Sequence, residues 1–246
     1  MQIVVDGILT NYQILGNEKN KSILILHGWG RNLTDWLNVG QNLSDRYSVI
    51  LLDLPGHGGT GLPLKQPYDT SNYADFAISF LHKIGIKSTI LIGHSFGGKI
   101  SIDIASKSKI INKLFLIDSS GVETKNNKVK SKIILAKIIK SINSLLPSLL
   151  SRKILLSLAS ADYKSAGELL PSFKKIVSQN VSDSAKNIKV QTYIIWGEKD
   201  KELALVCAKK LHNLISNSII RIVWGAGHHP HLEKPDKFYN LLREYI

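Results

Sequence analysis

The chain has a single cysteine, Cys207, among its 246 residues, and it has only one methionine and seven prolines. One cysteine cannot form an internal disulfide, and no cluster of Cys and His has the spacing of a zinc site. No run of about 18 apolar residues occurs, so the sequence predicts no membrane-spanning helix. The first residues lack a basic stretch followed by an apolar core, so we expect no secretory signal. These absences favour a cytoplasmic protein.

Acidic residues are also scarce, because 19 Asp and Glu stand against 32 Lys and Arg, a formal net charge of +13. Such an excess can mark a protein that binds nucleic acid or an anionic membrane. Here the lysines are scattered and no nucleic-acid recognition motif accompanies them, so we expect no nucleic-acid partner. The length and a hydrophobic content of 43% suit one α/β domain, with or without an insertion, that buries a substantial core.

The most informative stretch is residues 89–107. An aliphatic run at 89–92 predicts a buried strand, Gly-His-Ser-Phe-Gly follows at 93–97, and a helical pattern begins at Lys99. G-x-S-x-G between a strand and a helix is the arrangement of a nucleophile elbow. So sharp a turn strains the serine backbone and leaves no room for a Cβ at the flanking positions. It would lift the Ser95 hydroxyl out of the sheet and point the first helical amides at developing negative charge. The alternative is an ordinary serine in a glycine-bracketed turn.

Strand and helix patterns alternate along most of the chain. The predicted strands cover residues 3–5, 12–15, 22–26, 47–52, 89–92, 114–117, 191–196 and 219–224, and the predicted helices cover about 34–43, 71–83, 99–107, 202–214 and a segment from Pro235. This alternation predicts an α/β fold with a doubly wound, mostly parallel sheet. From Gly121 to about Ile188 only helical patterns occur. We therefore predict a core domain of residues 1–121 and 189–246, with a helical cap, 122–188, inserted after the sixth strand.

Two later loops supply the partners that a serine nucleophile needs. A serine hydroxyl requires a base, and the base requires a group that holds its tautomer. Open α/β sheets place their sites at the carboxyl ends of the strands. Asp200 lies in the loop after the strand at 191–196, and His228 lies in the loop after the strand at 219–224. Ser95, Asp200 and His228 thus follow the order serine, acid, histidine, and we predict that they form a catalytic triad.

Three further motifs accompany these residues. His-Gly-Trp-Gly stands at 27–30, Asp-Leu-Pro-Gly-His-Gly at 53–58, and Gly-Ala-Gly-His at 225–228, followed by Glu233 and Pro235. With them the chain resembles the α/β-hydrolase superfamily over essentially its whole length, and within it the small bacterial esterase-like members that carry a helical cap. The resemblance implies that the backbone amides of Trp29 and Phe96 form an oxyanion hole.

The same resemblance implies a role for each member of the predicted triad. Ser95 would attack a carbonyl carbon. His228 would take the serine proton and later protonate the leaving group, while Asp200 would orient His228 and stabilise its charged form.

Other residues compete for the roles of acid and base. Glu198 and Asp118 are alternative acids, since each also lies at the end of a strand. His229 and His231 are neighbours of the predicted base, and we interpret them as residues of the pocket rim or the surface. His94, which precedes the nucleophile, is expected to support the structure.

A serine at the elbow restricts the chemistry. Epoxide hydrolases and haloalkane dehalogenases of this superfamily use an aspartate there. A serine forms an acyl-enzyme, so we predict a serine esterase that hydrolyses a carboxylic ester with a small or medium acyl group, and we expect no metal or other cofactor. Thioester hydrolysis, carbon–carbon bond hydrolysis and cofactor-free perhydrolysis would use the same triad. A protein of another class, a ligand-binding module of this fold without catalysis, is the further alternative.

The predicted cap combines apolar and basic positions. The apolar ones either pack on the core or form a lid, and they include Ile133, Ile138, Leu149, Leu155 and Leu158. The basic ones have Glu123 as their only nearby acid, and they are Lys125, Lys128, Lys130, Lys132, Lys137 and Lys140. A basic face of this kind is either simply solvated or in weak contact with an anionic membrane or an acidic carrier protein.

Overall fold

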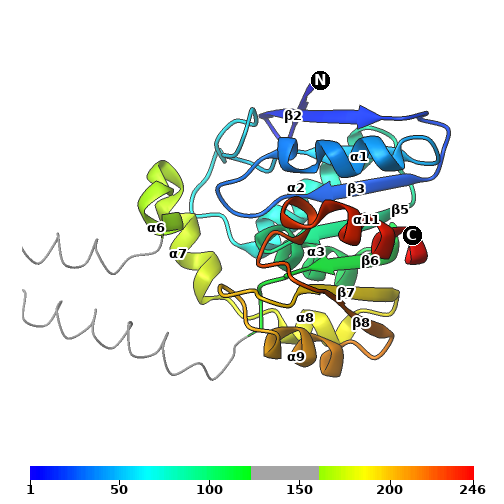
Figure 1. The fold of residues 1–246 in the computed structure, drawn as a ribbon. Coiled ribbons are helices and arrows are strands. Elements are labelled where there is room, and N and C mark those ends of the chain that lie inside the picture. The colour runs from blue at the N-terminus through cyan, green and yellow to red at the C-terminus, as the bar shows by residue number, and fades with distance from the viewer. Residues whose placement is uncertain (123–160) are drawn as a thin grey trace, which may run out of the picture.

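The computed structural model describes residues 1–122 and 161–246 and contains one eight-stranded sheet in the order β1-β2-β4-β3-β5-β6-β7-β8 (Figure 1). The strands are β1 (Gln2–Val5), β2 (Ile8–Leu15), β3 (Ser22–Leu26), β4 (Ser48–Leu52), β5 (Thr89–His94), β6 (Ile111–Ile117), β7 (Gln191–Gly197) and β8 (Ser218–Val223). The six strands from β4 to β8 in this order run parallel, whereas β2 pairs antiparallel with both β1 and β4. The predicted mostly parallel sheet is confirmed.

The central strands are apolar along their whole length because helices cover both faces of the sheet. In β3, Leu24 and Leu26 belong to one core, and Ile23 and Ile25 belong to the other. Helices α2 (Thr70–Lys83), α3 (Phe96–Lys107) and α9 (Val206–Leu214) pack on the first face. The second face carries η1 (Leu33–Trp36), α1 (Leu37–Leu43) and α11 (Pro235–Tyr245). Strands buried on both faces are typical of parallel sheets with crossover helices.

The described part of the insertion between β6 and β7 is helical. It consists of α6 (Ala161–Ser165), η3 (Gly167–Leu169), α7 (Leu170–Ser178) and α8 (Ser182–Asn187). In Figure 1, α6 and α7 lie beyond the carboxyl ends of the parallel strands. Helix α8 instead packs against α3 and α9, within the helical layer of the core. The cap boundaries of 122 and 188 stay a prediction.

Several expectations fall on residues that the structure does not describe. They concern the apolar positions Ile133, Ile138, Leu149, Leu155 and Leu158 and the basic series Lys125, Lys128, Lys130, Lys132, Lys137 and Lys140. Within 1–122 and 161–246, every helix is too short or too polar to cross a bilayer.

The helices after β7 and β8 differ from those that the sequence predicted. The helix expected from about residue 202 begins only at Val206, because Asp200 accepts hydrogen bonds from the backbone N–H groups of Glu202 and Leu203 and holds a turn there. The short helix α10 (Pro230–Glu233) lies after the strand that carries His228, and the sequence pattern did not indicate it.

Candidate active site

The turn that carries Ser95 is a strained connection between β5 and α3. Ser95 has φ +51° and ψ −110°, in the region that L side chains rarely adopt. A Cβ at Gly97 would collide with the carbonyl oxygen of Leu26, and one at Gly93 would collide with the side chain of Ser101. Both glycines are therefore needed for the elbow, as the motif predicted. Strain of this kind persists only where the surrounding structure holds it, and it is frequent at functional sites.

The three predicted triad side chains lie together at the carboxyl ends of β5, β7 and β8. The Oγ of Ser95 is 3.0 Å from Nε2 of His228. On the other side of the ring, Nδ1–H of His228 donates to Oδ2 of Asp200 at 2.8 Å. The second carboxylate oxygen of Asp200 accepts from the backbone N–H groups of Glu202 and Leu203, at 2.7 and 2.9 Å. This arrangement leaves Nε2 as an acceptor for the serine proton.

His228 and Asp200 shift each other's pKa values. Burial alone lowers the pKa of His228, but the hydrogen bond and the charge of Asp200 outweigh it, and the pKa is raised above its usual value. Burial raises the pKa of Asp200, yet the hydrogen bond and the charge of His228 bring it below the ordinary range. Asp200 is therefore ionised, and His228 is a stronger base than a free imidazole.

Trp29 and Phe96 carry the two backbone N–H groups that are predicted to form the oxyanion hole. The backbone N–H groups of Trp29 and Phe96 have no acceptor among the residues described, and the two rings contact each other with centroids 5.1 Å apart. His27 fixes the loop that carries Trp29: its Nδ1–H donates to the carbonyl of Gly28 at 2.7 Å, and its Nε2 accepts from the backbone N–H of Leu54 at 3.0 Å. Burial lowers the pKa of His27, so the ring holds this bridge in its neutral form.

Asp53 braces the neighbouring turn. Its carboxylate accepts from the backbone N–H groups of Leu33 and Gly59 and from the side-chain amide of Asn11, at 2.7, 2.8 and 2.7 Å. With three donors satisfied, this buried acid is a structural element of the loops around the site.

The alternative acids occupy other positions. Glu198 accepts from the backbone N–H of Gly225 at 2.8 Å. Asp118 is completely buried beside Asp200, and its Oδ1 accepts from the backbone N–H of Gly197 at 2.9 Å. The carboxylate that accepts the Nδ1–H of His228 is that of Asp200.

The rings of His94, His229 and His231 cluster beside His228. The Nε2–H of His94 donates to the carbonyl of His228 at 2.7 Å and so supports the loop of the candidate base. His231 is buried and stacks on Trp36, with centroids 4.0 Å apart and planes 5° apart. The ring of His229 lies 4.9 Å from that of His94. His231 is thus part of the interior and not of the surface, which corrects our interpretation of it as a rim or surface residue.

Two contributors to the site were not predicted. Glu202, an exposed residue, places its Oε2 3.6 Å from Nε2 of His228. Phe173 of α7 brings its ring within 5.1 Å of Trp29. The sequence contains no signal for the second contact, because hydrophobic periodicity does not tell where an inserted helix sits over the sheet.

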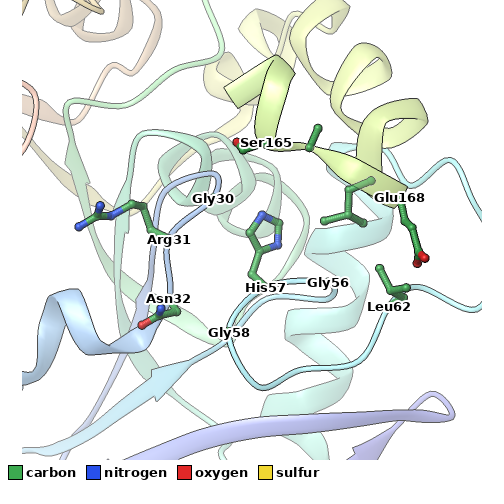
Figure 2. Close-up of a pocket in the computed structure, with 11 residues that line it drawn as sticks. Gly30, Arg31, Asn32, Gly56, His57, Gly58, Leu62, Ser165 and Glu168 are labelled. Atoms are coloured by element: carbon green, nitrogen blue, oxygen red, sulfur yellow. The ribbon is translucent and has the colours of Figure 1, made fainter. Parts of the chain in front are cut away.

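A cavity of about 320 Å³ adjoins Gly30, in the loop that carries Trp29 (Figure 2). It is lined by Gly30, Arg31, Asn32, Gly56, His57, Gly58, Leu62, Ser165, Ala166, Glu168 and Leu169. None of the three triad side chains lines it. Trp29 connects the two regions, since its ring packs against His57 in the cavity wall and against Phe96 beside the nucleophile.

The sheet order, the serine elbow and the loops after β7 and β8 define an α/β hydrolase. The model of the "Alpha/beta hydrolase family" matches residues 23–241, and the chain belongs to this family. The resemblance noted in the sequence is thereby confirmed.

Individual relatives and solved structures share about a quarter of their residues with this chain. An uncharacterized hydrolase of Bacillus subtilis (strain 168), YugF, is 23% identical over 267 residues, covering 100% of this chain and 97% of the relative. Lipase 1 of Psychrobacter immobilis is 26% identical over 241 residues, covering 90% of this chain and 75% of the lipase. Among solved structures, a bacterial membrane phospholipase A superposes with a TM-score of 0.81 at 23% identity, covering 99% of this chain and 84% of that chain. Family and relatives support a hydrolase.

Proposed function

We propose that the protein is a serine hydrolase that cleaves carboxylic esters through an acyl-enzyme, with Ser95, His228 and Asp200 as its catalytic triad. The observation that carries this proposal is the continuous chain of contacts from Ser95 Oγ through both ring nitrogens of His228 to Asp200. A serine at the elbow next to an imidazole that a carboxylate orients is the arrangement that acyl transfer requires.

The reaction follows from this geometry. Nε2 of His228 accepts the proton of Ser95 while Oγ attacks the carbonyl carbon of the ester. The N–H groups of Trp29 and Phe96 then donate to the oxyanion of the tetrahedral intermediate. His228 returns its proton to the departing alkoxide, which leaves as an alcohol. Water, deprotonated by the same nitrogen, attacks the acyl-enzyme, and collapse of the second intermediate restores Ser95 with its proton and releases the acid.

The aromatic side chains beside the site and one of the relatives support the substrate class. Aromatic side chains of the core and the insertion, Trp29, Phe173 and Tyr163, follow one another beside the site. They favour an ester with an apolar group of small or medium size. The relative named Lipase 1 points to the same chemistry. Thioesters and activated carbon–carbon bonds are the alternative substrates of this triad, and perhydrolysis is its alternative reaction. A cytoplasmic location and contact of the basic segment with an anionic membrane or an acidic carrier are further expectations from the sequence.

The first test is covalent labelling by a fluorophosphonate probe. The wild-type protein is expected to become labelled, Ser95→Ala to lose the label, and Ser106→Ala, a control further along the same helix, to keep it. Turnover of p-nitrophenyl esters from acetyl to dodecanoyl then measures the acyl pocket by its chain-length optimum. If Ser95→Ala is still labelled, or if the wild-type protein is not labelled, the acyl-enzyme proposal is wrong. Labelling without turnover of any ester would direct attention to thioesters and carbon–carbon substrates.

A further inference from the structure

Asp118 is a buried acid with no counter-ion among the residues that the structure describes. It follows β6 with φ +40°, is 0% exposed, and is fixed by its backbone N–H, which donates to Ile195, and by Oδ1, which accepts from Gly197. Its other oxygen, Oδ2, is buried and has no donor among the residues described. The side-chain ligand atoms of Asp118, Asp200 and His228 all lie within 4.8 Å of one another.

Two carboxylates this close inside a protein cannot both be ionised, so one of them holds a proton. The hydrogen bonds decide which. Asp200 accepts from two backbone N–H groups and from Nδ1–H of His228, all of which stabilise its anion. Asp118 accepts from one backbone N–H only. The proton therefore belongs on Asp118.

We propose that Asp118 is a positioning residue of the active site, a protonated carboxylic acid whose O–H donates to the carboxylate of Asp200. The inference rests on the proposed function, since Asp200 acts there as the orienting acid. The hydrogen bond joins the ends of the adjacent strands β6 and β7 and fixes the plane in which the Asp200 carboxylate faces His228. Asp118 touches neither the nucleophile nor the substrate and acts through Asp200.

The electrostatic surroundings of Asp118 agree with this assignment. Burial raises the pKa of Asp118 to about 10, and the negative charges of Asp200 and Glu233 act in the same direction, whereas the hydrogen bond from Gly197 opposes them. The same contact with Asp118 contributes to the lowered pKa of Asp200, although the hydrogen bond from His228 contributes more.

The test compares Asp118→Asn, Asp118→Ala and Asp200→Asn by the second-order rate of fluorophosphonate labelling as a function of pH. This readout needs no knowledge of the substrate. An asparagine amide can donate to Asp200 and accept from Gly197, so Asp118→Asn is expected to label within about threefold of wild type, because it keeps both hydrogen bonds. Asp118→Ala is expected to lose about ten- to a hundredfold, the range for a lost hydrogen bond to a charged group. Asp200→Asn is expected to lose about 10⁴-fold, as does a serine protease whose triad aspartate is replaced by asparagine.

The pH profile separates positioning from a merely structural role. Without the O–H of Asp118, more negative charge remains on Asp200 opposite Nδ1, so the pKa of His228 rises and the acid limb of the profile moves upward in Asp118→Ala. It stays in place in Asp118→Asn. A structural loss would lower the rate at every pH without moving that limb.

Three results would overturn the inference. A loss of about 10⁴-fold in Asp118→Asn would make Asp118 the charged acid of the triad. Wild-type labelling rates in both Asp118 variants would show that no positioning contact exists. Labelling that EDTA abolishes and a divalent cation restores would place a metal ion between the carboxylates.

Protonation can also be tested without catalysis. At about pH 8, ordinary carboxyl groups are ionised. The infrared spectrum of the wild-type protein should still show a protonated carboxyl band there, and that of Asp118→Asn should lack it. If the probe does not label the wild-type protein but this band is present, the proposed function fails and the shared proton stands. If the band is absent, the shared proton fails whatever the labelling shows.

Discussion

The buried ammonium group of Lys99 gives a prediction whose sign and size follow from the structure. Lys99 lies one helical turn after Ser95 and is 3% exposed. Its Nζ donates to the carbonyl of Ile176 at 2.5 Å and to that of Gln179 at 2.7 Å, at the end of α7. Burial lowers the pKa of Lys99 from 10.5 to about 8. The residue thus fastens the insertion to the helix that follows the nucleophile, at the cost of dehydrating a charge.

The depressed pKa makes stability depend on pH in a defined direction. Below about pH 8 the lysine is charged in both the folded and the unfolded chain, so the cost of burial is present in full. Between the folded and unfolded pKa values the unfolded chain binds more protons, and the free energy of unfolding therefore rises with pH. From about pH 7 to about pH 10 the rise attributable to Lys99 is about 2 to 3 kcal/mol.

Urea unfolding of the wild type and Lys99→Met, followed by tryptophan fluorescence at several pH values, measures this rise. Other titrations are common to both proteins and cancel in the difference between their unfolding free energies. The unfolding free energy of the wild type minus that of Lys99→Met should therefore increase with pH. Lys107→Met is the control: partial burial lowers the pKa of Lys107, but its ion pairs with Asp75 and Asp103 raise it, so no such increase is expected. A Lys99 difference that is constant from about pH 7 to pH 10 would refute the reasoning.

Three further predictions concern the surroundings of the triad. Because the charge of Glu202 helps to raise the pKa of His228, Glu202→Gln should move the acid limb of the labelling profile to lower pH. An unmoved limb would contradict this. Asp53→Ala leaves three donors without an acceptor and should lower the free energy of unfolding by about 3 kcal/mol or more, measured by urea titration. His231→Phe keeps the stacking on Trp36 and removes two buried nitrogens that have no partner in the described part of the chain, so it should raise that free energy by about 1 kcal/mol. A loss of similar size would show that those nitrogens have partners.

Much of the fold could be predicted because its signals are local. Continuous aliphatic runs such as 22–26 and 89–92 have no polar face, and only a sheet covered on both sides accommodates them. The elbow is equally local, because Gly93 and Gly97 are required by atoms within a few residues or on the adjoining strand. Local sequence therefore specified both the parallel sheet and the position of Ser95.

The contacts of the insertion could not be predicted in the same way. Lys99 occurs in an apolar helical pattern where a charged residue has no evident use, and its acceptors are carbonyls about eighty residues further along the chain. Any residue has a backbone carbonyl, so the sequence of α7 does not indicate which of its residues accept hydrogen bonds from Lys99. The approach of Phe173 to Trp29 is of the same kind, since aromatic residues suit many apolar surfaces.

The choice between Asp118 and Asp200 shows where sequence reasoning reaches its limit. β6 and β7 are adjacent and parallel, with Ile117 in register with Ile195, so carboxylates just beyond their ends must come close together. The sequence can place both acids at the same edge of the sheet, but it cannot assign the proton that they share. That assignment depends on how many N–H groups reach each carboxylate, and the loop after β7 supplies two to Asp200, at Glu202 and Leu203. The shape of this loop thus makes Asp200 the partner of His228, and Asp118 then holds Asp200 in place.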